Sequence, residues 1–108
     1  MKARRHKRYH IKFPISFIGN QGVGEGTIFN ISEGGCAIES GKHVQVGDAI
    51  TLRLYIPSHE QPVQIGQAGV TWKAGSDFGV EFVQIDPEHE ERLNKVLAGL
   101  AQDSDTAS

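Results

Sequence analysis

The sequence predicts a mainly all-β fold, a six-stranded antiparallel β-barrel followed by one C-terminal α-helix. Two observations carry this prediction. Short segments of alternating apolar and polar residues recur over residues 11–85, and Gly-containing turns separate them. After residue 85 the apolar residues instead repeat at intervals of three and four, as they do on one face of a helix. Many short strands joined by tight turns are typical of a closed or nearly closed barrel.

Six strands are expected within this barrel region. The first covers residues 11–18, where every second side chain from Ile11 to Phe17 is apolar. Pro14 lacks a backbone donor, so this strand should lie at an edge or contain a break. The remaining strands are expected at Gly24–Ile31, Cys36–Glu39, Ala49–Ile56, Val63–Trp72 and Phe78–Val83.

The helix is expected over residues 86–101. Asp86 suits the N-cap and Pro87 the first helical position. Three glutamates follow in the first turns, where the helix dipole favours negative charge. Its apolar stripe could cover the barrel or dock a partner, and the stripe consists of Leu93, Val96, Leu97 and Leu100. Residues 102–108 are polar and small, and we expect a disordered tail there.

Length and composition indicate a single cytoplasmic domain. A chain of 108 residues is of single-domain size. Its one cysteine, Cys36, excludes an internal disulfide and fits a reducing compartment. No apolar run approaches the ~20 residues of a membrane helix, and no apolar region follows the N-terminal charges as in a signal peptide. We therefore expect no membrane insertion.

Charge is divided sharply along the chain. Residues 1–10 hold five of the eleven Lys and Arg and no acid, whereas the other 98 residues carry six basic and thirteen acidic side chains. This asymmetry indicates a flexible basic arm with a polyanionic partner, the alternative being a merely solvated terminus. The acidic body disfavours a long DNA or RNA strand lying across the barrel.

Two short motifs have the chemistry of a phosphate-bearing ligand site. Arg4 and Arg8, with Arg5 between them, offer planar donor forks that can grip phosphate or lie flat on a base. Asn30 has an amide that can pair with a purine edge, and Ser32 has a small hydroxyl. The adjoining Gly34 and Gly35 allow a ligand to approach the backbone closely, although a plain turn between two strands would also explain them.

Catalysis is not expected. The five histidines are scattered without metal-ligand spacing, and one cysteine cannot complete a thiolate zinc site. No local signature picks out a catalytic triad. We expect no metal and no cofactor.

The two motifs, in this order and separation, resemble those of the PilZ family of bacterial receptors for cyclic di-GMP. Arg4-Arg5-His6-Lys7-Arg8 is similar to the RxxxR element of that family, and Asn30-Ile31-Ser32-Glu33-Gly34-Gly35 is similar to its (D/N)xSxxG element. Val70-Thr71-Trp72 and Phe78-Gly79-Val80-Glu81-Phe82 look like its last two barrel strands. The resemblance runs from about Arg4 to Leu100.

The resemblance implies a six-stranded barrel with a C-terminal helix, no catalysis, and cyclic di-GMP as the ligand. Arg4 and Arg8 would hold its phosphates and guanines from an arm that folds over it, with Arg5 as an auxiliary. Asn30 would meet a guanine edge and Ser32 a phosphate or guanine. The remaining implied site residues are Gly35, which would keep the floor of the site open, its neighbour Gly34, and Trp72, which would lie near the ligand or pack on the barrel.

Such a receptor would act as an adaptor on an unidentified protein effector, in processes such as motility or biofilm formation. The alternative is a PilZ-like interaction module that works without nucleotide, for example in pilus assembly or motility. The helix stripe and the acidic body would then be its working surfaces. Only residues 1–3 precede the first arginine, so one bound nucleotide and a stacked pair both remain open.

Overall fold

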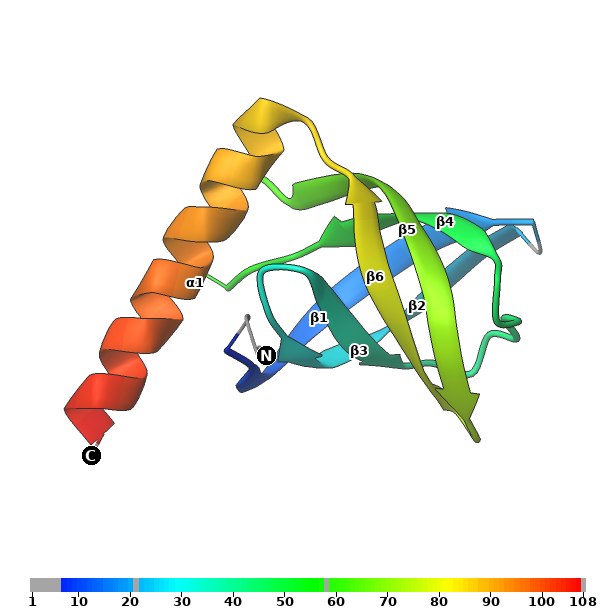
Figure 1. Cartoon of the computed structure of the whole chain (residues 1–108), viewed down its shortest axis with the longest axis horizontal. Helices are drawn as coiled ribbons and strands as arrows, with labels where there is room; N and C mark the ends of the chain where they lie inside the picture. Colours follow the sequence, from blue (N-terminus) through cyan, green and yellow to red (C-terminus); the bar gives the residue numbers. More distant parts are fainter. Residues whose placement is uncertain (1–6, 21, 58, 108) are drawn as a thin grey trace, which may run out of the picture.

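A computed structural model describes residues 7–20, 22–57 and 59–107, with side chains described through residue 101. Within these residues the chain forms six strands and one helix, which confirms the predicted fold class (Figure 1). The elements are β1 (Tyr9–Gly19), β2 (Gly22–Ile31), β3 (Gly35–Glu39), β4 (Ala49–Leu54), β5 (Val63–Ala74), β6 (Asp77–Gln84) and α1 (Pro87–Ala107).

The strands close into a barrel in the order β1-β2-β3-β6-β5-β4, with every neighbouring pair antiparallel. β4 pairs with β1 from Ile15 to Ile18, so β1 is not an edge strand. β1 is continuous from Tyr9 to Gly19 and Pro14 is paired with Thr27, so the only irregularity in its pairing with β2 is a register shift before Pro14, between His10 and Phe13. Closure leaves no free edge along the paired part of β1, which removes a route to aggregation.

Alternate residues of the strands fill the barrel with aliphatic side chains. Successive side chains on a strand point to opposite faces, so buried and more exposed residues alternate along much of β1 and β4, whereas β3 is buried from Gly35 to Ile38. Phe17 and Phe78 meet edge to face inside it, with ring centroids 5.6 Å apart. The largest fully buried side chains are Phe78, Ile15, Ile28, Ile31, Ile38, Leu52, Leu54, Ile65, Leu93 and Val63.

α1 lies across one end of the barrel (Figure 1). The apolar stripe of α1 packs against the barrel core. Leu93 and Val96 are buried in the barrel core. For these two residues the stripe therefore covers the barrel and is not free to dock a partner. The amide of Gln64 in β5 donates to His89 Nδ1 over 3.1 Å. Arg92 Nη2 donates to the side chain of Gln61 over 2.8 Å, which fixes α1 to the segment before β5.

The start of β1 and the end of α1 differ from the boundaries predicted for them. β1 begins at Tyr9, inside the segment that the sequence assigned to the arm. α1 continues to Ala107, past the boundary expected at residue 101, in a stretch that contains no Pro or Gly to end it. None of the helices in the described part of the chain is long and apolar enough to cross a membrane.

Removal of the Leu93 side chain should show how far the barrel depends on α1. Leu93 is 2% exposed, and truncation of such a residue leaves a cavity. We expect Leu93→Ala to lower the free energy of unfolding by about 2–5 kcal/mol in urea denaturation. Glu91→Ala, an exposed change on the same helix, should stay within about 0.5 kcal/mol of the original protein. Equal stabilities of the two variants would contradict the covering role of α1.

Candidate functional site

Arg8 and Asn30 join the two motifs in space. Arg8 immediately precedes β1, and Asn30 lies near the end of β2 opposite His10 in the antiparallel register. Arg8 Nη1 donates a hydrogen bond of 2.7 Å to Asn30 Oδ1, between residues 22 positions apart in the chain. A charged donor makes this a stronger bond than a neutral pair would. The register of the β1–β2 hairpin therefore brings the second arginine of RxxxR onto the Asn of the second motif.

A pocket of about 460 Å³ lies beside this contact. That volume is within the range of about 300–1,000 Å³ typical of small-molecule sites. Both predicted motifs contribute to its wall, and so do β5 and β6. The lining residues are Arg8, Ser32, Gly34, Gly35, Thr71, Val80 and Glu81. The structure thus gathers Arg8, Ser32, Gly34 and Gly35 around one cavity, with Asn30 bonded to its arginine.

Ser32 shapes the turn between β2 and β3. It is 2% exposed, its amide donates to the Gly35 carbonyl over 2.9 Å, and its hydroxyl donates to the same oxygen over 3.3 Å. The amide of Phe82 in β6 donates to the Gly34 carbonyl over 2.9 Å. These bonds satisfy the backbone of a buried turn. The hydroxyl of Ser32 is therefore occupied within the turn in this structure.

Gly35 is required by the close approach of β3 to β6. A Cβ placed on Gly35 would collide with the backbone carbonyl oxygen of Val80. Any side chain would thus force the two strands apart. The family resemblance implied that Gly35 keeps the floor of the site open. The structure shows a second reason for a glycine at this position, the close packing of β3 against β6.

Cys36 lies under the site and is fully buried. Desolvation raises the pKa of its thiol well above the usual range, and the nearby positive charge of Arg8 opposes this only in part. The thiol therefore stays neutral at physiological pH. A neutral buried thiol is a poor nucleophile and a poor metal ligand, so Cys36 acts here as a small core residue.

Trp72 lies outside the barrel core and outside the pocket lining. Its side chain is 43% exposed, and its indole covers Gly79 on the neighbouring strand, where a Cβ would collide with it. Its chain neighbour Thr71 does line the pocket. Arg4 and Arg5 lie outside the described residues, so their predicted roles, and the ligand roles of the other site residues, stay predictions.

The structure adds two polar pocket residues that the motifs did not indicate, Thr71 and Glu81. Both belong to strands that are distant from the motifs in sequence. Glu81 alternates with the inward-facing Val80 on β6, so the strand pattern shows that it points outward. The pattern alone does not show which part of the surface it faces.

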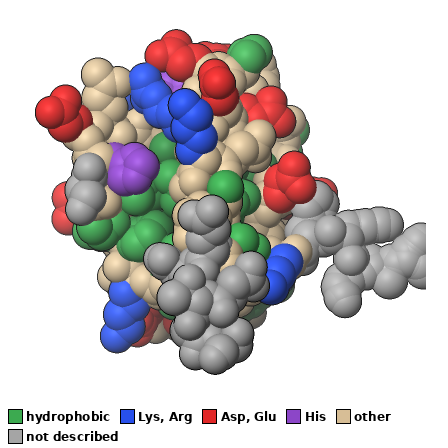
Figure 2. Space-filling model, turned by 90° about the vertical axis from the view of Figure 1, so that its left-hand side faces the viewer, with side chains coloured by type: hydrophobic (Ala, Val, Ile, Leu, Met, Phe, Trp, Pro, Cys, Tyr) green, Lys and Arg blue, Asp and Glu red, His purple; other side chains and the backbone are tan. Residues whose placement is uncertain are grey.

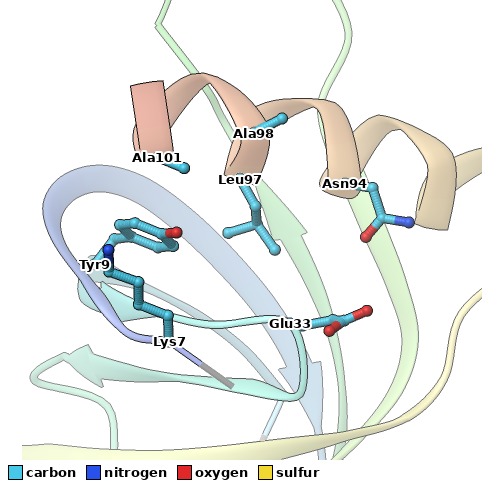
Figure 3. A pocket seen from close by; sticks show the side chains of 7 residues that line it. All are labelled: Lys7, Tyr9, Glu33, Asn94, Leu97, Ala98 and Ala101. Atoms are coloured by element: carbon cyan, nitrogen blue, oxygen red, sulfur yellow. The ribbon is translucent and has the colours of Figure 1, made fainter. Parts of the chain in front are cut away.

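A second hollow, of about 330 Å³, connects the arm to α1 (Figure 3). Lys7 and Tyr9 form one side of it, and Glu33 in the β2–β3 turn lies nearby. From the helix, Leu97 points toward Tyr9, and Asn94 points toward Glu33. Lys7 Nζ lies 5.7 Å from the centre of the Tyr9 ring. The segment that carries Arg8 thus faces the pocket on one side and the helix on the other.

A closed barrel with a pocket on its outer wall and a covering helix defines a small β-barrel domain. The chain belongs to the PilZ domain family, whose model matches residues 2–99. This confirms the resemblance drawn from the two motifs.

Solved structures share this fold at low sequence identity. The motility inhibitor MotI/DgrA of Bacillus subtilis aligns with a TM-score of 0.77 at 19% identity, over 95% of this chain and 53% of that one. The PilZ domain of YcgR from Escherichia coli, determined with c-di-GMP, gives a TM-score of 0.74 at 11% identity over 95% of both chains. The PilZ domain of CeSA from a cellulose-synthesizing bacterium gives 0.68 at 13% identity, over 88% of this chain and 98% of that one.

The chain spans about half the length of the motility inhibitor. No curated protein sequence matches the chain. Among the residues that the structure describes, no group of three or more His, Cys, Asp and Glu could hold a metal ion.

The packing role of Gly35 can be separated from any role in ligand binding. Gly35→Ala should lower the free energy of unfolding by about 1–3 kcal/mol, because the new methyl group overpacks the contact with Val80. Gly69→Ala is the matched control, since nothing lies within 4 Å of a Cβ built there. Thermal or urea unfolding without ligand measures both. Equal effects of the two substitutions would show that the close approach at Gly35 tolerates a side chain.

Proposed function

We propose that this protein is a non-catalytic receptor for cyclic di-GMP that signals to a protein partner. One observation carries the proposal: the Arg8 guanidinium is bonded to Asn30 beside a pocket of about 460 Å³ that Ser32, Gly34 and Gly35 also line. Arg8 of the first motif and three residues of the second motif thus line one cavity, which supports the proposal. A PilZ domain of the same fold, that of YcgR, has been determined with this nucleotide.

The chemistry of the ligand suits such a site. Cyclic di-GMP is a dianion with two flat purines, and arginine offers both a bidentate phosphate grip and a face for stacking. Arg4 and Arg5 would add charge to that of Arg8 from the arm. Because the attraction is partly between exposed charges, affinity should fall as salt is added.

The position of the arm supplies a route for the signal. Lys7 and Tyr9 line the hollow against α1, and Arg8 between them lines the ligand pocket. A ligand that draws the arginines inward would therefore change the surface formed by the arm and the helix. Ordering of the arm costs roughly 1–2 kcal/mol per residue fixed, and the ordered arm is a new surface for an effector.

Substitution of the arginines tests the receptor function directly. Arg4→Ala and Arg8→Ala should each weaken cyclic di-GMP binding at least tenfold, about 1.4 kcal/mol, because each removes a phosphate-binding fork. Isothermal titration calorimetry measures the affinity and the stoichiometry, with GTP and cyclic GMP as specificity controls.

Arg53→Ala is the matched control for these variants. Arg53 is exposed on β4, where it donates to Gln64 Oε1 over 3.0 Å, and it does not line the pocket. Its loss should leave affinity unchanged within about threefold. If the folded Arg8→Ala protein binds cyclic di-GMP as tightly as the Arg53→Ala protein, this pocket is not the cyclic di-GMP site.

Limited proteolysis tests the signalling step. Trypsin should cut after the basic residues of the arm in the free protein and more slowly in the presence of saturating cyclic di-GMP, because an ordered, ligand-bound arm fits a protease poorly. The rate of appearance of the shortened chain, followed by mass spectrometry, gives the protection. Identical rates with and without ligand would mean that the arm does not order on binding.

A specific surface favours the second candidate, an interaction module that works without nucleotide. An open groove of about 390 Å³ lies between the barrel and α1, and Figure 2 shows hydrophobic side chains gathered on this side with His, Lys and Arg near them. Its lining residues are Phe13, Ile56, Pro57, His59, Lys95, Val96, Gly99 and Leu100. If the unmodified protein shows no cyclic di-GMP binding in a titration, the interaction module becomes the favoured function, and this groove becomes its candidate binding surface.

A further inference from the structure

Glu81 places a carboxylate in a pocket proposed for a dianion. It lines the pocket together with Arg8, Thr71 and the turn of the second motif. A carboxylate near phosphate groups costs electrostatic energy. Its presence is explained if it meets a part of the ligand that donates hydrogen bonds.

Guanine offers such a part. Its Watson–Crick edge carries two adjacent donors, N1–H and the N2 amino group, and a carboxylate with its two acceptor oxygens can take both. Adenine presents an acceptor at N1 and a donor at N6, so a carboxylate would meet one of its acceptors with no proton to share. A site that relies on such donors discriminates strongly against the base that lacks them.

The other polar side chains in and beside the pocket have less capacity to accept hydrogen bonds from these donors. Asn30 Oδ1 already accepts from Arg8 at 2.7 Å. The hydroxyl of Ser32 donates to the Gly35 carbonyl, and the hydroxyl of Thr71 lies 3.4 Å from the Gly79 carbonyl. Within the described residues, Glu81 forms no side-chain hydrogen bond or ion pair, so both of its oxygens can face a ligand.

The residues beside Glu81 on both neighbouring strands are glycines and carry no side chain. Its cross-strand partners are Gly35 on β3 and Gly69 on β5, and a Cβ at Gly69 would meet nothing within 4 Å. Strands lie about 4.8 Å apart, so the two glycines leave a strip roughly 10 Å wide across three strands with Glu81 at its centre. A flat base can approach the strip without meeting a neighbouring side chain from either of these positions.

Trp72 lies next to this strip. It is paired with Gly79, two residues before Glu81 on the same strand and therefore about 7 Å away. Its indole lies over Gly79 on the outer surface. A base whose edge meets Glu81 would thus have an aromatic side chain beside it.

We infer that Glu81 is the residue that selects guanine, by accepting hydrogen bonds from the Watson–Crick edge of one base of the bound cyclic dinucleotide. The inference rests on the proposed function, because it needs a guanine-containing dinucleotide in this pocket. In this inference Glu81 on β6 determines which base is bound, and the arginines bind the phosphates.

The inference is tested by whether Glu81→Gln lowers or raises the affinity for cyclic di-GMP. Glutamine keeps the shape and removes the charge, so simple electrostatics predicts tighter binding of any dianion. Guanine recognition predicts the opposite for cyclic di-GMP, because the amide can accept only one of the two donors and turns its own N–H₂ toward the other. We expect at least a tenfold loss of cyclic di-GMP affinity, and no loss or a gain for cyclic di-AMP, which lacks those donors.

The experiment titrates both cyclic dinucleotides into the full-length chain and its Glu81→Gln, Glu81→Ala and Glu39→Gln variants by calorimetry. Glu39 is exposed on β3 outside the pocket, so its variant repeats the charge change elsewhere on the same sheet and should bind like the parent. Thermal unfolding checks that each variant is folded.

Unchanged or tighter cyclic di-GMP binding by Glu81→Gln would overturn the role of Glu81 while leaving the receptor function in place. A parent protein that binds cyclic di-AMP as well as cyclic di-GMP would also overturn it. Absence of any cyclic di-GMP binding by the parent would remove the proposed function itself, and the role of Glu81 with it.

Discussion

The hydrogen bond between Arg8 and Asn30 is the contact on which the candidate site depends. It ties the segment before β1 to the end of β2, and it holds a guanidinium at the mouth of the pocket. The β1–β2 register makes it possible, because it sets His10 opposite Asn30. The charge of the guanidinium strengthens this bond, and the bond orients the Arg8 side chain beside the pocket. Such preorganisation reduces the entropy lost on binding.

Closure of the barrel completes the pocket. β3 is only five residues long, yet it pairs with β2 on one side and with β6 on the other. This brings the β2–β3 turn against residues nearly fifty positions further along the chain, so Val80 and Glu81 become its neighbours. The close approach at Gly35 and the buried bonds of Ser32 make the turn a rigid part of the barrel wall.

The similarity to proteins at 11–19% identity has a physical explanation. A closed barrel needs alternation of apolar residues, turns of suitable length and glycines where strands approach, and many sequences meet these conditions. The residues exposed on the outer wall are free to differ.

The sequence by itself determined the class of the fold, the approximate place of the elements and the two motifs, because alternation, turn residues and helix capping are local properties of the chain. It also indicated that Leu93 and Val96 belong to an apolar stripe. Only the tertiary structure decided that this stripe covers the barrel, that β1 begins at Tyr9, and that Trp72 lies outside the core over Gly79. It alone brought Thr71 and Glu81 to the motifs, because contacts between distant strands depend on pairing order and register. A strand pattern shows which face a residue occupies, whereas its neighbours across the barrel are set by closure of the whole chain.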